Sequence, residues 1–279
     1  LFGFKKLSTP LDDAVLNLSY IQLSFYFISF IAVIYFVLKS INQTLETDAK
    51  ILTNITAYIV RSSFWAVLIV GIADFIISFL VVEKLAEPIF NEAIKINLVI
   101  PTFRITFIHF PLILISFVIG YFTRSVGFIW LAVLVVGSEF LIVLSRFIFE
   151  YEQAFQGDLV RFWYAALYLF ASAYALIHEG HVRVDVLYTG FSERKKAWTN
   201  TIGSLLFGIP LCLIIIFLGM GGKASIINGP VISFEITQQG SNGLYLLYLM
   251  AVYLAVFAVT MLIQFTSYFM DSSHKLLKN

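Results

Sequence analysis

Long apolar runs are the feature that most restricts how this chain of 279 residues can fold. About 20 consecutive apolar residues with few charges are enough to cross the hydrocarbon core of a bilayer. The sequence contains seven such runs, and only 13% of its residues are charged, whereas a soluble domain averages about a quarter. The predicted spans are Ala14–Leu38, Phe64–Val82, Ile105–Gly120, Val126–Phe149, Leu159–Ile177, Trp198–Leu218 and Leu244–Phe269.

These spans are expected to be helices. Backbone polar groups inside lipid must be satisfied within the segment, and the runs lack the alternation of barrel strands. The predicted fold is therefore an all-α integral membrane protein with about seven transmembrane helices. We divide it into an N-terminal extension of about three helices (residues 1–122) and a four-helix membrane domain (residues 123–279, core 126–269). Pro101 and Pro111 flank or interrupt the third span.

The segments between the spans differ in character. Ile41–Tyr58 is predicted to be a polar loop, and Glu83–Leu98 a short amphipathic helix with Pro88 near its start. Glu150–Asp158 is polar and too short for a domain. No linker or repeat divides the chain further.

Basic residues in the connections predict the orientation, because lysine and arginine gather on the cytoplasmic side. With a cytoplasmic C-terminus, ten of the eighteen lie inside, namely Lys39, Lys50, Arg61, Arg124, Arg183, Arg194, Lys195, Lys196, Lys275 and Lys278. The other eight are Lys5, Lys6, Lys84, Lys95, Arg104, Arg146, Arg161 and Lys223. The last four spans give the clearer contrast, six against three. We therefore expect a cytoplasmic C-terminus and, with seven spans, an N-terminus outside.

The stretch His178-Glu-Gly-His181 resembles a metal-binding motif but differs from it in spacing. A zinc protease helix carries its histidines four residues apart, which places both imidazoles on one face. Here they are three apart and Gly180, a frequent helix terminator, lies between them. Cys212 is the only cysteine, and no basic run suggests a nucleic-acid partner. We predict no metal, no cofactor and no catalytic site, with an intramembrane metalloenzyme as the hypothesis to exclude.

Asp74 and Glu139 lie near the middles of predicted spans, where ionisable residues are costly and call for a functional hypothesis. They could bind a proton or cation in transport, or each could be protonated or bonded to a neighbouring helix. The sequence identifies no intramembrane basic partner for either, so we expect modest effects from Asp74→Asn and Glu139→Gln. Arg146, two helical turns beyond Glu139, can extend to the outer interface.

Two further features mark the C-terminal half. Asp158 and Arg161 are three residues apart where the fifth span begins, so they can pair on one helix face. Gly203, Gly208 and Pro210 predict a kink in the sixth span. Ion-coupled carriers use a pair of such interrupted helices in two repeated halves, and we find one without a matching copy.

Residues from about Val126 to Phe269 resemble the small membrane subunit of TRAP transporters, the DctQ-like family. The resemblance is carried by Arg146-Phe147, Asp158-Leu-Val-Arg161, Gly180-His-Val-Arg-Val-Asp185 and the basic loop Ser192-Glu-Arg-Lys-Lys196. The residues that we assign to this motif and to assembly are Arg146, Asp158, Arg161, Gly180, His181, Arg183 and Asp185. The sequence departs from the family in having Asp158 where a glutamate is usual, and in its N-terminal spans.

The resemblance implies a scaffold role in the bacterial inner (cytoplasmic) membrane. Such subunits pair with a large DctM-like membrane subunit that holds the sodium and substrate sites, while a periplasmic binding protein delivers an organic acid or similar solute. The expected partners are these two proteins and lipids, with no nucleic acid. The alternative is a self-sufficient ion-coupled transporter that uses Asp74 or Glu139. Neither hypothesis includes an enzymatic activity, and the sequence does not identify the transported substrate.

Overall fold

The computed structural model describes residues 13–123, 129–177, 188–236 and 242–278, which form helices joined by short connections. Within these ranges there is no β-strand, so the all-α fold class is confirmed. The first elements are α1 (Asp13–Lys39), α2 (Leu45–Val82), α3 (Glu92–Leu98), α4 (Pro101–Arg104), the π turn η1 (Ile105–His109) and α5 (Phe110–Phe122). The later ones are α6 (Ile129–Ile148), α7 (Ala154–Ile177), α8 (Glu193–Gly203), the π turn η2 (Ser204–Gly208), α9 (Ile209–Gly219), α10 (Asn228–Ser233) and α11 (Leu247–Lys278).

Five continuous helical segments of the described chain are long and apolar enough to cross a membrane. They are α2, the α4–η1–α5 segment, α6, the α8–η2–α9 segment and α11. The other two predicted spans correspond to α7, which has 24 residues, and to α1, which has 27. The chain is therefore a multi-pass membrane protein by helix length and composition.

The predicted polar loop Ile41–Tyr58 is wrong, because α2 already begins at Leu45. Thr44 caps this helix by accepting a hydrogen bond from the Thr47 backbone N–H (3.3 Å), and acidic residues occupy the first turn, where they favour the helix dipole. The polar sequence indicates exposure to water, but leucine, lysine, glutamate and alanine are also good helix formers. Likewise α7 begins at Ala154, five residues before the predicted span.

The chain between α2 and α4 contains a shorter helix than predicted. Pro88 lies in a series of turns, and α3 begins only at Glu92, where the Asn91 side chain accepts from the Ile94 backbone N–H (3.0 Å). The structure therefore confirms a short helix here but not its predicted start.

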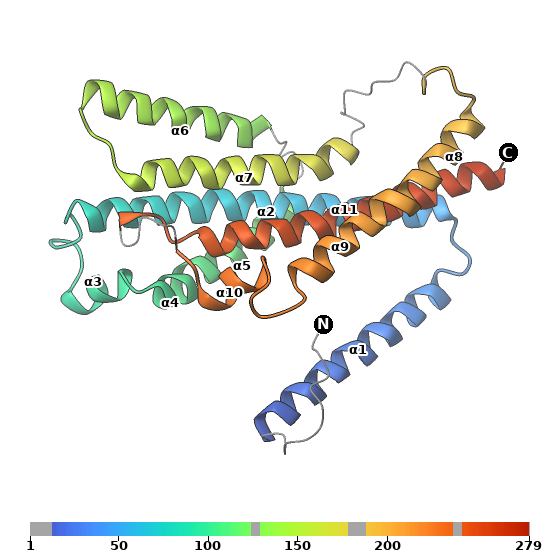
Figure 1. The fold of residues 1–279 in the computed structure, drawn as a ribbon, viewed down its shortest axis with the longest axis horizontal. Helices are drawn as coiled ribbons and strands as arrows, with labels where there is room; N and C mark the ends of the chain where they lie inside the picture. Colours follow the sequence, from blue (N-terminus) through green and yellow to red (C-terminus); the bar gives the residue numbers. More distant parts are fainter. Residues whose placement is uncertain (1–12, 124–128, 178–187, 237–241, 279) are drawn as a thin grey trace.

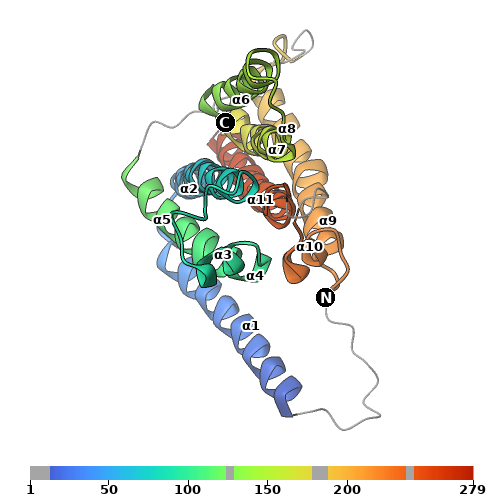
Figure 2. The ribbon, with the colours of Figure 1, turned by 90° about the vertical axis from the view of Figure 1, so that its left-hand side faces the viewer.

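The centre of the bundle is the pair α2 and α11, with α7 packed against both and α6 outside α7 (Figure 1). α5 contacts α2, and α9 contacts α11, so that α5 and α9 lie on opposite sides of the central pair (Figure 2). Gly71 allows the close approach of α7, since a Cβ there would lie 2.8 Å from Trp163 Nε1. The predicted division at residue 123 is untested, but helices from both parts share this core.

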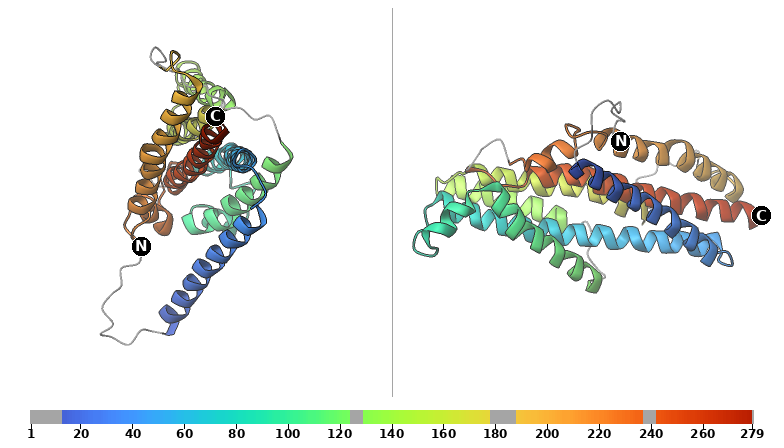
Figure 3. Two further views of the ribbon diagram at one scale, coloured as in Figure 1. Left: turned by 90° about the vertical axis from the view of Figure 1, so that its right-hand side faces the viewer. Right: turned by 90° about the horizontal axis from the view of Figure 1, so that it is seen from below.

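The first helix differs from the others in its packing. The large apolar side chains of α1 between Tyr20 and Leu38 are exposed, and α1 lies apart from the bundle in Figure 2 and in the left-hand view of Figure 3. A surface of this kind requires lipid or another protein around it.

Two π turns interrupt the helices, each two residues before a proline. η1 precedes Pro111 and η2 precedes Pro210. Proline has no N–H to donate to the carbonyl four residues earlier, and π turns accommodate such breaks. The expectation of a single interrupted helix is therefore wrong. The two interruptions nevertheless lie in segments on opposite sides of the α2–α11 pair (Figure 2).

Candidate functional site: a buried polar network

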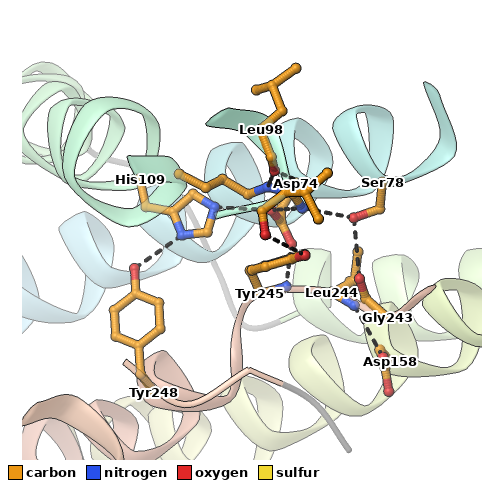
Figure 4. A network of polar contacts seen from close by, with 11 residues as sticks. Asp74, Ser78, Leu98, His109, Asp158, Gly243, Leu244, Tyr245 and Tyr248 are labelled. Atoms are coloured by element: carbon orange, nitrogen blue, oxygen red, sulfur yellow. Dashed lines mark hydrogen bonds and ion pairs between the residues drawn. The ribbon is translucent and has the colours of Figure 1, made fainter. Parts of the chain in front are cut away.

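Asp74, on α2, lies at the centre of a buried polar network inside the helix bundle (Figure 4). Its Oδ1 accepts hydrogen bonds from Arg104 Nη1 (2.9 Å) and His109 Nε2 (3.0 Å). Its Oδ2 accepts from the backbone N–H of Tyr245 (2.7 Å). The side chains of Asp74, Arg104 and His109 are at most 1% exposed. The expectation that Asp74 has no intramembrane basic partner is therefore wrong.

Arg104 is held by several groups besides Asp74. Its Nη1 also donates to Ser78 Oγ (2.9 Å), and its Nε and Nη2 donate to the Leu98 carbonyl oxygen (3.0 and 2.8 Å). The guanidinium carbon lies 3.8 Å from the centre of the Tyr245 ring, which gives a cation–π contact. The arginine is therefore fixed in position and keeps its charge, since guanidinium groups do not deprotonate in proteins.

His109 completes the network as a neutral imidazole in our assignment. Its Nε2 donates to Asp74, which leaves Nδ1 to accept from the Tyr248 hydroxyl (3.1 Å). The two rings lie nearly parallel, with an interplanar angle of 5°. Because Arg104 already balances the charge of Asp74, a neutral histidine keeps the buried cluster uncharged overall.

The π turn explains how Arg104 and His109 reach the same carboxylate oxygen. They are the residues immediately before and at the end of η1. Residues five apart point in different directions on an α-helix, but the i→i+5 hydrogen bonding of a π turn brings them towards one face. The Phe110 N–H donates to the Ile105 carbonyl in this pattern. Pro111, which favours the interruption, therefore contributes to building the site.

The network also joins segments that are distant in the sequence. Ser78 Oγ on α2 donates to the Gly243 carbonyl (3.3 Å), and the next N–H, of Leu244, donates to Asp158 Oδ2 on α7 (3.2 Å). The next residue, Tyr245, donates its backbone N–H to Asp74 and its hydroxyl to the Val99 carbonyl oxygen (3.1 Å). The short segment before α11 is thus tied to α2, α7 and the chain before α4, as the dashed lines of Figure 4 show in part.

This arrangement is suited to holding helices together. Donors of the chain itself take three of the roughly four lone-pair positions of the Asp74 carboxylate, and the adjacent Arg104 guanidinium disfavours a second cation there. A buried ion pair adds little net stability when its groups are desolvated, but breaking one partner is strongly destabilising. We therefore infer that the network determines which helices pack together, and that it adds little to the net stability of the fold.

The structure separates the other predicted site residues. Asp158 is buried and Arg161 is 69% exposed, and their side chains approach to 3.5 Å, so the predicted pairing is confirmed. Arg146 is exposed near Glu152, with 3.4 Å between Nε and Oε2. Glu139 is exposed at the middle of α6, where the described residues offer it no polar partner.

The family motif residues Gly180, His181, Arg183 and Asp185 lie outside the described residues, as does His178. Among the residues that are described, no group of three or more metal-ligating side chains comes together. The metal prediction for this stretch therefore stays a prediction.

The sequence does not indicate Arg104, His109 and Tyr245 as partners of Asp74. It equally does not indicate Ser78 and Tyr248, which contact Arg104 and His109 respectively. Arg104 directly precedes the predicted third span, which begins at Ile105, so the sequence places it in an outer connection. The available signal was that Arg104 and His109 are ionisable residues at the start of an apolar span, which by default indicates a partner inside the membrane.

Long apolar helices that share a buried, charge-balanced network define a helical multi-pass membrane protein. Residues 135–270 match the family model described as "Tripartite ATP-independent periplasmic transporters, DctQ component". Over this region the chain belongs to the DctQ family, as a TRAP transporter small membrane subunit with an N-terminal extension. No curated protein and no solved structure is similar enough to give a match.

Proposed function

We propose that this chain is the scaffold subunit of a sodium-coupled importer for an organic acid or similar solute. It would act in the bacterial inner membrane with a large DctM-like subunit and a periplasmic binding protein, without an enzymatic activity of its own. The observation that supports this role is the closed coordination of Asp74, whose oxygens are all used by Arg104, His109 and Tyr245. A subunit whose buried acid is occupied in this way holds helices together and leaves ion binding to its partner.

The outer face of α6 is the surface that we assign to the large subunit. α6 packs on α7, while Trp130, Val136 and Phe140 are exposed. Glu139 lies among them at the middle of the helix, and a charged group facing lipid at that depth costs about 2.5–3.5 kcal/mol. A polar group on a partner helix would remove this penalty. Arg161 and Arg146, both exposed near the end of the same helix pair, extend the surface towards the membrane boundary.

The decisive experiment is reconstitution of uptake in proteoliposomes with three preparations: this chain alone, the large subunit alone and the co-purified complex. The binding protein, substrate and a sodium gradient are supplied in each case. We expect uptake only with the complex. The variants Arg161→Ala, Asp185→Ala and Glu139→Leu should lower the yield of complex, with uptake reduced in proportion. Glu139→Gln, which keeps a hydrogen-bonding side chain, should have a modest effect.

The affinity for sodium tests the scaffold role directly. In the surviving complex of each variant, the apparent sodium and substrate affinities should be unchanged. A tenfold shift in an intact complex, about 1.4 kcal/mol, would place these residues in the transport site and contradict the proposal.

The second candidate is a self-sufficient ion-coupled carrier, which the buried Asp74–His109 pair and the two π turns favour. It would require the ion to open a network that is closed here. Sodium- or proton-driven uptake by this chain alone, abolished by Asp74→Asn, would establish it and overturn the scaffold assignment.

A further inference from the structure

We propose that the corner between α2 and the end of α5 binds the phosphate of an anionic phospholipid headgroup. An open hollow of about 890 Å³ lies there, lined by Asn54, Tyr58, Arg61, Tyr121 and Phe122. No acidic residue is among them. The inference concerns the N-terminal extension, outside residues 135–270, and does not depend on the proposed function.

The hollow lies at the level of the membrane interface. The apolar part of α2 begins at Phe64, three residues after Arg61, and α5 ends at Phe122 while α2 extends beyond that level (Figure 3). Tyr121 and Phe122 are more than 70% exposed at this boundary, where aromatic residues of membrane proteins gather. Headgroup phosphates occupy the same depth.

Three residues of the hollow form one stripe on α2. Asn54, Tyr58 and Arg61 are spaced by four and three residues, so their side chains share a helix face. This face meets α5 at a close contact, since a Cβ on Gly120 would lie 2.4 Å from Ser62 Oγ and 2.9 Å from Ser62 Cα. The close approach places Arg61 Nε 3.5 Å from the Gly120 carbonyl oxygen, a long hydrogen bond that orients the guanidinium.

The donors that remain suit a phosphate. In the part of the chain that the structure describes, Arg61 has no carboxylate partner, and its two terminal nitrogens make no hydrogen bond with the protein. Among the described residues, the side chains of Asn54 and Tyr121 likewise make no hydrogen bond. The Tyr58 hydroxyl already donates to the Phe117 carbonyl oxygen (3.1 Å). Arginine binds phosphate oxygens through paired N–H groups, and the amide and phenol add further donors.

Two features favour a lipid over a free anion. Below the hollow, Leu114, Ile115 and Val118 of α5 are exposed, so acyl chains can lie along this helix. The same end of the bundle carries the basic residues Lys39, Arg194, Lys195 and Lys278. Three further lysines there, Lys50, Lys196 and Lys275, pair with Glu46, Glu193 and Asp271. Basic pockets between helices on the cytoplasmic side bind anionic headgroups.

The test is lipid binding to the purified full-length chain, delipidated in detergent and titrated by native mass spectrometry. Phosphatidylglycerol and phosphatidylcholine with identical acyl chains are the two probes. We expect a preference for phosphatidylglycerol, reduced about fivefold by Arg61→Ala, which corresponds to about 1 kcal/mol. Asn54→Leu, at an exposed position, should weaken binding two- to threefold without affecting folding, on the order of the loss of one hydrogen bond. The matched control Lys278→Ala removes a basic residue from the same end and should leave the preference unchanged.

Three results would overturn the proposal. Equal binding of the two lipids would show that the site does not select an anionic headgroup. An unchanged preference in folded Arg61→Ala or in Asn54→Leu would place the site elsewhere. Displacement of the lipid by millimolar inorganic phosphate, or its loss when the large subunit binds, would assign the hollow to a free anion or to the partner protein.

Discussion

Asp74 shows how a single buried residue depends on neighbours from distant parts of the chain. Arg104 and His109 follow it by 30 and 35 residues, and Tyr245 by 171. A carboxylate inside a membrane is tolerated when each of its oxygens has donors, and this one has three. The same burial makes the network sensitive to the loss of any one member.

Asp74→Leu should therefore destabilise the protein by about 3–5 kcal/mol, because Arg104 would remain buried without its counter-charge. The free energy of unfolding can be measured by SDS titration in mixed micelles. Removing both charges in Asp74→Leu/Arg104→Met should recover most of this loss, since apolar side chains can replace a buried ion pair.

The matched control for this prediction is Glu46→Gln, which breaks the ion pair with Lys50 on the exposed start of the same helix (2.7 Å). It should leave stability unchanged, because exposed pairs are screened by water. A double variant as unstable as Asp74→Leu alone would contradict the assignment of Arg104 as the balancing charge.

At the scale of helices, glycine decides how closely α5 approaches α2. Gly120 faces the backbone of Ser62, and a side chain there would have to separate the two helices. Because α5 is continuous with η1, such a shift also affects the position of Arg104 and His109. The helix contact and the polar network are therefore coupled.

Gly120→Leu should lower stability by about 1–3 kcal/mol, as overpacked sites do. It should also weaken phosphatidylglycerol binding, because Arg61 would lose its contact with the residue 120 carbonyl. Thermal unfolding in detergent and the lipid titration provide the two measurements. The control is Gly203→Ala, where a Cβ meets nothing within 4 Å and the better helix propensity should stabilise slightly. Equal behaviour of the two variants would show that the α2–α5 contact is not tight.

For the whole molecule, α2 links the N-terminal extension to the DctQ region. It packs against α7 and α11, and Phe64, Val67 and Val70 belong to the same apolar core as residues of these helices. The predicted domains 1–122 and 123–279 can be tested by expressing them as separate chains. We expect the two to co-purify, and neither to be stable alone, because each exposes the faces of this core. A stable and monodisperse 123–279 fragment would establish an independent four-helix domain.

Orientation is the second property of the whole molecule. The end of the bundle where α2 and α8 begin and α11 ends carries the basic clusters, which supports the predicted cytoplasmic C-terminus. Reporter fusions at Lys195 and at the C-terminus should both indicate the cytoplasm, and a fusion at Lys223 the periplasm. A periplasmic signal at Lys195 would reverse the assignment and move the lipid site to the other leaflet.

The apolar runs by themselves determined that the chain is a helical membrane protein, because the bilayer requires long segments without exposed backbone polar groups. The motif residues around Asp158 and Gly180 likewise identified the family, since they are local in sequence. Helix ends were less predictable, as the start of α2 at Leu45 shows, because polar residues outside the bilayer form helices as readily as loops.

Only the tertiary structure decided the partners of Asp74 and the surroundings of Arg61. Both depend on contacts between helices far apart in sequence, which hydrophobic patterning does not encode. By sequence alone Arg104 belongs to an outer connection, whereas the π turn before Pro111 directs Arg104 and His109 to one carboxylate. Arg61 counted only as one more basic residue until the close contact at Gly120 placed it beside the end of α5. Composition sets where a residue lies relative to the membrane, and helix packing sets which groups it meets there.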